Sequence, residues 1–212
     1  MRWRKWRRPK DCRMENVDLM KYDAIPDAVW TKLSRAADDP ALQLRLMAVA
    51  TVTPDGKPSN RTLVLRGADK PSGLVWFHTD RRSPKMHHLR ERPQISALGY
   101  DQHDHVQIRL DGEVTLHETD ALADSHWEQV SMAVRHAYSS QFAPGEPIQQ
   151  PDPRLQVMRQ QQKLGPADHG RHNFVVMQVR VEVIDWLQVG SMSQVRAILR
   201  AAKDWKAEPL VP

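Results

Sequence analysis

The pattern of apolar and polar positions predicts a chain dominated by β-strands. Short runs of β-branched and aliphatic residues recur along it, separated by segments rich in proline, glycine, aspartate and lysine. The runs expected to form strands are 44–53, 61–66, 74–79, 94–100, 105–116, 174–189, 195–200 and 205–210. Closing such a series of strands into a barrel removes the exposed edges of the sheet. We therefore expect a mainly β fold, an antiparallel barrel of about six strands with helices packed outside.

Helical spacing of apolar residues is found in the remaining segments. Residues 26–37 predict an amphipathic helix, for which Asp27 can supply the cap. A short helix is expected after Ser83 and before the proline at position 93, and a longer one over 118–137. Residues 155–164 indicate a short polar helix or a loop.

Turn residues indicate how the strands are connected. The segment 53–58 combines proline, aspartate and glycine and predicts a hairpin turn. Gly67 is expected to end the strand that begins at Arg61, and Gly112 to bend or bulge a later strand. Because strand residues alternate between faces, Arg61 and Arg66 point to the same side only if a bulge or the strand end intervenes.

The segment Asn60–Lys85 is where the sequence indicates chemistry. Ser83 followed by Pro84 is typical of a helix start, with the serine as N-cap. Such a start leaves backbone N–H groups and the positive end of the helix dipole facing outward, which favours a bound phosphate. Three cations lie beside it in the sequence, namely Arg81, Arg82 and Lys85. We expect a phosphate site here, and the alternative is a solvated basic surface.

The net charge of +5 is concentrated at the N-terminus. Residues 1–13 carry seven Lys or Arg and one Asp, which gives +6, so the remaining chain sums to −1. Trp3 and Trp6 between arginines are compatible with nucleic-acid binding, but the near-neutral body argues against a nucleic-acid module. The alternatives are a disordered extension, or a true start at Met14 or Met20.

Length and composition favour one domain over residues 26–212, preceded by a basic tail over residues 1–25. No run of 18 apolar residues is present and the N-terminus lacks the apolar core of a secretory signal, so we expect a soluble, cytoplasmic protein without a membrane partner. Cys12 is the single cysteine, which rules out an internal disulfide within this sequence. No metal is expected, because neighbouring helical residues point in different directions and no cysteine or HExxH companion accompanies the candidate ligands His87, His88, His103 and His105.

Several motifs around the candidate phosphate site occur in a fixed order. Arg-Thr-Leu-Val-Leu-Arg-Gly at 61–67 is followed by an apolar strand ending in Phe-His-Thr-Asp and then by Arg-Ser-Pro-Lys at 82–85. This series resembles the FMN-binding split-barrel proteins related to pyridoxamine 5'-phosphate oxidase, and most of all the members described only as oxidase-related. The resemblance runs from about Val29 to the C-terminus and is strongest over Leu46–Gly112. It implies an FMN-binding split β-barrel, FMN as cofactor, and a homodimer with the flavin between subunits.

Carried over by position, the resemblance also implies site residues. The cofactor contacts would be Arg61, Thr62, Leu63, Val64, Arg66, His78, Thr79, Ser83, Lys85, Gln107, Trp186 and Arg200. The substrate contacts would be Arg66, Arg135, Ser139 and Arg196, and the Phe142–Gly145 loop would lie near the cofactor. Arg61 and Lys85 would hold the phosphate, and the amide of Gln107 can both donate and accept a hydrogen bond at the flavin edge.

The sequence departs from the oxidases at the implied substrate site. The oxidases carry an arginine, any residue, a histidine and then a second arginine two residues later, whereas here Ile198 stands in the histidine position between Arg196 and Arg200. Isoleucine can neither hydrogen-bond nor exchange a proton. We therefore expect an FMN-dependent oxidoreductase with an altered substrate site, and the alternatives are a genuine pyridoxamine/pyridoxine 5'-phosphate oxidase or a non-catalytic FMN-binding protein.

Overall fold

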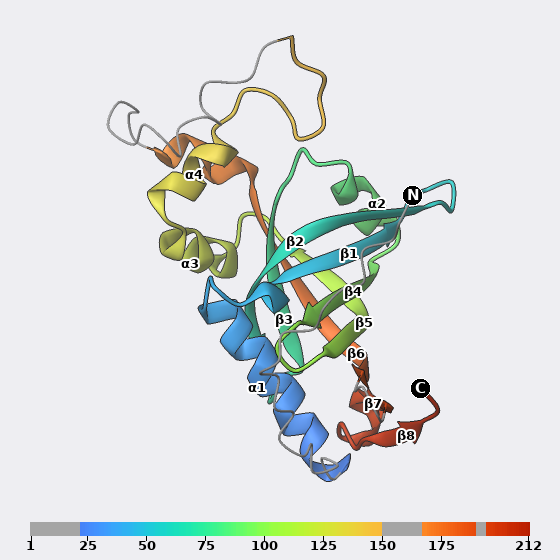
Figure 1. Ribbon diagram of the computed structural model, residues 1–212. Coiled ribbons are helices and arrows are strands. Elements are labelled where there is room, and N and C mark those ends of the chain that lie inside the picture. The colour runs from blue at the N-terminus through green and yellow to red at the C-terminus, as the bar shows by residue number, and fades with distance from the viewer. Residues whose placement is uncertain (1–21, 150–166, 190–193) are drawn as a thin grey trace, which may run out of the picture.

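A computed structural model describes residues 22–149, 167–189 and 194–212 of the 212-residue chain (Figure 1). The basic segment 1–13, Cys12 and the segment 155–164 lie outside the described residues. The described part begins with Tyr22, and Ile25 is fully buried. The domain boundary expected at residue 26 stays a prediction.

The strands form one eight-stranded antiparallel sheet. They run in the order β3-β2-β1-β4-β5-β6-β7-β8, and β3 also pairs with β6, which closes the first six strands into a barrel. This confirms the expected barrel. The strands are β1 (Leu46–Val52), β2 (Pro58–Asp69), β3 (Leu74–Asp80), β4 (Gln94–Asp101), β5 (Val106–His117), β6 (Phe174–Val189), β7 (Gln194–Arg200) and β8 (Glu208–Leu210).

The long strand β6 has two roles in the fold. Its first half, from Phe174 to Arg180, pairs with β3 and closes the barrel. Its second half, from Val183 to Val189, pairs with β7. The strands β7 and β8 therefore extend from one end of the barrel, as the lower right of Figure 1 shows.

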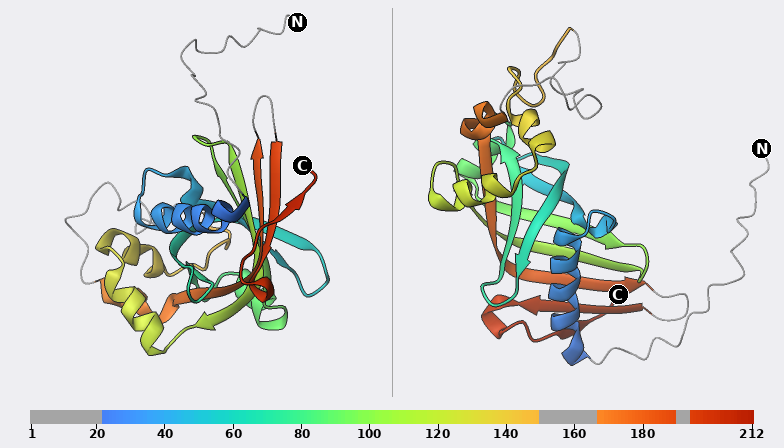
Figure 2. Two further views of the ribbon diagram at one scale, coloured as in Figure 1. Left: turned by 90° about the horizontal axis from the view of Figure 1, so that it is seen from below. Right: turned by 90° about the vertical axis from the view of Figure 1, so that its left-hand side faces the viewer.

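Helices cover the barrel on separate sides (Figure 2). The helix α1 (Ile25–Asp38) packs against β2 and buries the apolar positions that its periodicity predicts, including Val29 and Leu33. The helix α2 (Lys85–Glu91) follows β3, and α3 (Ala121–Gln129) and α4 (Met132–Tyr138) form a second apolar cluster on Phe174 and Val176. Short 3-10 helices complete the described part, namely η1 (Tyr22–Ala24), η2 (Gln43–Arg45), η5 (Ala167–Asn173) and η6 (Ala201–Lys203).

Two helix predictions were wrong in detail. Asp27 does not cap α1, because the N-cap position falls on Ala24 without a side-chain bond, and the Asp27 carboxylate accepts a hydrogen bond from Lys70 at 2.6 Å instead. The helix expected over 118–137 is two helices, because the chain leaves helical geometry at Val130 and starts again after Ser131.

Two strand predictions were also wrong in their ends. The strand expected to stop at Gly67 continues to Asp69, and the last strand begins at Glu208 rather than Trp205. Trp205 adopts a left-handed backbone conformation, with φ of 59°, in the turn before β8 and packs its ring against Trp30. This packing uses Trp205 as a contact to α1 rather than as a strand residue.

Both expected irregularities of the sheet are present. The pairing of β5 with β6 shifts register between Asp111 and Gly112, where an added Cβ would lie 2.3 Å from the carbonyl oxygen of Arg180. The pairing of β2 with β3 shifts between Leu65 and Gly67, so Arg66 occupies a bulge. Strand alternation alone would point Arg61 and Arg66 to opposite sides. The bulge at Arg66 changes this, so the two arginines can serve one site.

Candidate functional site

Arg61 is held in place by neutral oxygens of the neighbouring strand. Its Nη1 donates to the carbonyl oxygen of Val49 at 3.1 Å and to the Thr51 hydroxyl at 2.8 Å, and its Nη2 donates to the Ser59 hydroxyl at 2.7 Å. Val49 is directly opposite Arg61 in the β1–β2 register, which explains why the side chain reaches these partners. The guanidinium is therefore fixed without any carboxylate among its described partners.

Lys85 begins α2 and turns back toward the end of β3. Its Nζ donates to the hydroxyls of Thr79 at 2.8 Å and Ser83 at 2.6 Å, and the side chain is buried. The predicted helix cap is wrong, because the N-cap position belongs to Pro84 and makes no side-chain bond, while Ser83 serves Lys85. The backbone N–H groups of Met86 and His87 donate within this turn. The side chains, rather than a free helix start, therefore form the candidate site.

Arg61 and Lys85 lie close enough for their charges to interact. Burial first, and then the neighbouring Arg61 charge, lower the pKa of Lys85 to about 8. Burial also lowers the pKa of Arg61. The charge of Asp80 acts against this shift of the Lys85 pKa, but the Asp80 carboxylate makes its hydrogen bonds, at 2.9 and 2.6 Å, with the Arg82 guanidinium. Two cations with neutral acceptors only, within the described residues, form a site that an anion would stabilise.

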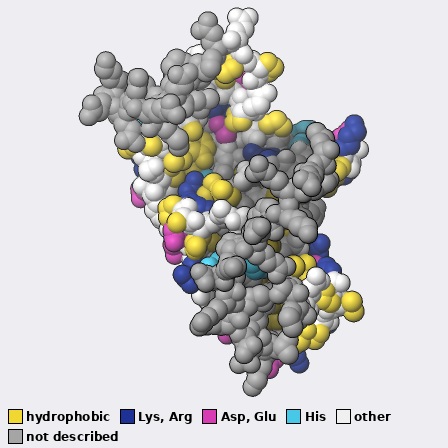
Figure 3. All heavy atoms as spheres, in the orientation of Figure 1, with side chains coloured by type: hydrophobic (Ala, Val, Ile, Leu, Met, Phe, Trp, Pro, Cys, Tyr) yellow, Lys and Arg dark blue, Asp and Glu magenta, His cyan; other side chains and the backbone are white. Residues whose placement is uncertain are grey.

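Thr62, Leu63 and Val64 lie on β2 between the two predicted arginines. Thr62 is exposed, whereas Leu63 and Val64 are half-buried. Figure 3 shows Lys and Arg side chains, in dark blue, scattered over both the upper and the lower half of this face of the molecule. This stretch of β2 therefore connects the Arg61 cluster to the bulge at Arg66.

Arg66 and His78 belong to a second group, whose side chains are half-buried. His78 Nε2 lies 3.1 Å from Nδ1 of His126 on α3, and burial, followed by the charge of Arg66, lowers the pKa of His78 to about 3. Burial raises the pKa of Tyr138 to about 12. Among the residues that the structure describes, the buried Nε of Arg66 has no hydrogen-bond partner, and neither does the indole nitrogen of Trp76. Unpartnered buried donors favour an acceptor from outside the chain.

Gln107, Arg196 and Arg200 lie on strands far from Arg61 in the same chain. Gln107 is on β5 and the two arginines are on β7, whereas Arg61 is on β2. The strands β1 and β4 lie between Arg61 and Gln107, and β3 and β6 lie between Arg61 and Arg200 through the pair that closes the barrel. Arg200 Nη1 bonds Glu208 at 3.0 Å. The described chain therefore does not bring these residues together with the Arg61 cluster.

Arg196 makes a two-pronged ion pair with a buried carboxylate. Its Nε and Nη2 bond the two oxygens of Asp185 at 3.0 and 2.7 Å, and Arg109 approaches the same carboxylate at 3.2 Å. Asp185 is only 2% exposed although its side chain lies outside the barrel interior. Two arginines thus cover this carboxylate, and one of them is the predicted substrate contact.

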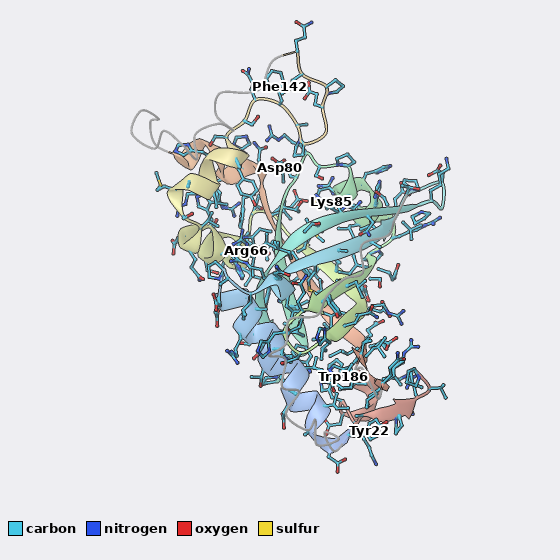
Figure 4. All side chains as sticks on the ribbon, viewed as in Figure 1. Tyr22, Arg66, Asp80, Lys85, Phe142 and Trp186 are labelled. Atoms are coloured by element: carbon cyan, nitrogen blue, oxygen red, sulfur yellow. The ribbon has the colours of Figure 1, made fainter. Side chains whose placement is uncertain are left out.

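The remaining predicted residues are engaged in packing or capping. Trp186 is 2% exposed in the barrel core and lies toward the lower end of the molecule, well away from Lys85 of the same chain (Figure 4). Arg135 donates to the carbonyl oxygens of Trp127 and Val130 at 2.8 and 2.9 Å, which closes the end of α3. The Ser139 hydroxyl donates back to the Arg135 carbonyl oxygen at 3.5 Å.

Several residues of these clusters were not among the sequence predictions as site residues. Their contacts join segments far apart in the chain, so no spacing pattern reveals them. For Asp185 alone the sequence contains an indication, because an acidic residue inside an apolar strand suggests a buried partner of opposite charge. The residues are Thr51, His88, Asp185, His126 and Tyr138.

The described surface is hollowed in several places. One cavity of about 370 Å³ is lined by Asp80, Arg82, Tyr138 and the Phe142–Gly145 loop. A cavity of about 510 Å³ lies elsewhere, beside Lys32 and Asp101, and none of the predicted site residues line it. Within the described ranges there is no cluster of three or more potential metal ligands, and no helix there is long and apolar enough to cross a membrane.

Comparisons with known proteins show which family part of this chain resembles. The family model described as pyridoxamine 5'-phosphate oxidase, FMN-binding domain, matches residues 27–118. A pyridoxine/pyridoxamine 5'-phosphate oxidase of Gluconobacter oxydans is 36% identical over 102 residues, which are 48% of this chain and 50% of that protein. The chain therefore spans about half the length of this oxidase.

Solved structures match over most of the chain. A pyridoxamine 5'-phosphate oxidase-related, FMN binding protein of Nostoc punctiforme has a TM-score of 0.70 and 25% identity, over 88% of this chain and 95% of that one. PhzG of Burkholderia lata, solved with tetrahydrophenazine-1-carboxylic acid, has a TM-score of 0.71 and 22% identity, over 93% and 98% of the two chains, and shows the shared fold. Residues 27–118 thus belong to the FMN-binding domain family of pyridoxamine 5'-phosphate oxidase, within a chain that has the split-barrel fold of the oxidase-related FMN-binding proteins.

Proposed function

We propose that this chain binds FMN and holds the phosphate of the cofactor between Arg61 and Lys85. The observation that carries the proposal is the pairing of these two cations with neutral oxygens only, in a partly buried position. The residues fit the cofactor, because a phosphate supplies the negative charge and the acceptors that this cluster lacks. The hydroxyls of Ser83 and Thr79 hold the ammonium group of Lys85, which would bind the same phosphate as Arg61.

The flavin ring would lie along β2, beyond the phosphate. Thr62, Leu63 and Val64 would line it, and Arg66 with His78 would meet its far end, where the Nε of Arg66 lacks an acceptor. When bound, FMN supplies hydride or electron transfer, while the protein positions it and excludes water.

A second copy of the chain would complete the site. The outer faces of β1 and β4 expose apolar side chains, with Leu46 at 54%, Leu98 at 39% and Tyr100 at 43% exposure. Tyr100 is directly opposite Gln107 in the sheet, so this apolar face continues toward the residues predicted to contact the flavin. A homodimer would cover this face and would bring Gln107 and Arg200 of one copy to the Arg61 cluster of the other.

We further propose an oxidoreductase whose substrate site differs from that of the oxidases. Two observations support this. Ile198 replaces a hydrogen-bonding histidine, and losing such a contact costs about 1–3 kcal/mol. Arg196 is already paired with Asp185, so a substrate anion would have to compete with a buried carboxylate for it. Arg135, the other predicted substrate arginine, caps α3.

Turnover distinguishes this proposal from the two alternatives. With FMN saturating, we expect little pyridoxal 5'-phosphate from pyridoxamine 5'-phosphate, and we expect Ile198→His to increase it. Robust turnover by the native protein would favour a genuine oxidase. FMN that is bound but not reduced by any nicotinamide or substrate tested would favour a non-catalytic FMN-binding protein.

A further inference from the structure

His88 is buried on α2 beside the Arg61 cluster, and it is not one of the proposed FMN contacts. Its Nδ1 lies 3.0 Å from the Thr51 hydroxyl, which itself accepts from Nη1 of Arg61 at 2.8 Å. Thr51 is 2% exposed and His88 8% exposed, so water competes little for these bonds. The three side chains form one continuous chain of contacts from α2 through β1 to β2.

The direction of each hydrogen bond follows from the donors available. A guanidinium can only donate, so the Thr51 oxygen accepts from Arg61 and keeps its single proton for another partner. The carbonyl oxygen of Ser59 lies at 3.5 Å, whereas Nδ1 of His88 lies at 3.0 Å. Nδ1 of His88 is the nearer of these two acceptors, and the Thr51 hydroxyl donates to it in the tautomer that carries its proton on Nε2. A neutral His88 fixes the hydroxyl so that a lone pair faces Arg61.

We infer that His88 is a positioning residue for the proposed phosphate site, where it orients Arg61 through the hydroxyl of Thr51. The inference rests on the proposed FMN site. The role of His88 should affect binding of the phosphate alone, because Arg61 would contact that group and not the flavin ring. Losing the acceptor on His88 frees the Thr51 hydroxyl to rotate and loosens the guanidinium without removing any charge.

The test compares FMN with riboflavin, which has the same ring and no phosphate, by fluorescence titration of the full-length protein. We expect His88→Leu to weaken FMN binding about fivefold or more and to leave riboflavin binding unchanged. His88→Asn places an amide oxygen near the position of Nδ1 and should stay within about twofold of the native protein. The matched control is His87→Leu, at the neighbouring helix position, because the His87 side chain is 68% exposed and faces Glu91.

If His88→Leu does not fold, Thr51→Val removes the hydroxyl at nearly constant volume and should give the same loss for FMN alone. An unchanged ratio of FMN to riboflavin affinity in the folded variants would overturn the inference, and so would a loss in His88→Asn as large as in His88→Leu. Failure of the native protein to bind FMN would instead overturn the proposed function, and with it the role of His88.

Discussion

Replacing Arg61 by alanine removes the cation that the structure fixes most firmly in the proposed site. The guanidinium has five N–H groups, and three of them donate to Val49, Thr51 and Ser59. The Nε–H and one Nη2–H make no hydrogen bond within the described residues. These two donors are the ones that remain for a phosphate.

The loss of one of these two hydrogen bonds to the phosphate sets the smallest effect expected. A hydrogen bond to a charged group contributes roughly 1.5–3 kcal/mol, so Arg61→Ala should weaken FMN binding about ten- to a hundredfold. Removing the charge of Arg61 also relieves the repulsion that lowers the pKa of Lys85, so Lys85 stays protonated and limits the loss. Riboflavin affinity should not change, because the proposed ring contacts lie farther along β2.

The assay is fluorescence titration with FMN and with riboflavin at fixed salt concentration. The control is Arg90→Ala, which removes the same charge from α2, where the half-exposed Arg90 pairs with Glu118 at 2.7 Å. The control should bind FMN like the native protein, apart from a small change that salt screens. Unchanged FMN affinity in Arg61→Ala, or an equal loss for riboflavin, would refute the assignment of Arg61 to the phosphate.

Further predictions concern pH, assembly and the sheet. Because the pKa of Lys85 is lowered to about 8 and a bound phosphate favours the protonated amine, FMN affinity should be full below about pH 8 and fall as the pH rises through that value; a flat profile would contradict this. If two copies share each site, mixing Arg61→Ala with Arg200→Ala chains should restore about a quarter of the sites, counted by tight FMN binding, whereas no recovery would place both residues in one copy. Gly112→Ala should lower the free energy of unfolding by roughly 1–3 kcal/mol in urea, because the added Cβ meets the carbonyl oxygen of Arg180 at 2.3 Å; an unchanged midpoint would show that the bulge adapts.

The barrel could be predicted from the sequence because its strands obey a local rule. In β1 and β5, buried and less buried residues alternate with period two, so Met47 and Ile108 face the core as their spacing indicates. The bulges were also accessible, since Gly112 interrupts a strand pattern and Arg66 breaks the alternation that starts at Arg61. These features can be predicted from local sequence because the alternation of side chains along a strand depends only on neighbouring residues.

The ends of elements and the partners of charged side chains could not be predicted in the same way. Ser83 precedes Pro84 as a helix cap would, but its hydroxyl accepts a hydrogen bond from Lys85. The buried ammonium requires an acceptor, and the Ser83 oxygen serves it instead of the helix end. Trp186 and Arg196 match a motif by position, yet the fold buries the first and pairs the second with Asp185. Such outcomes depend on residues brought together from distant strands.

The most direct test of FMN binding is the absorption spectrum of the freshly purified protein, followed by release and identification of any bound chromophore. We predict a flavin spectrum that bleaches on reduction, with FMN rather than riboflavin released on denaturation. A colourless protein that takes up no added FMN, or a haem or deazaflavin spectrum, would contradict the account.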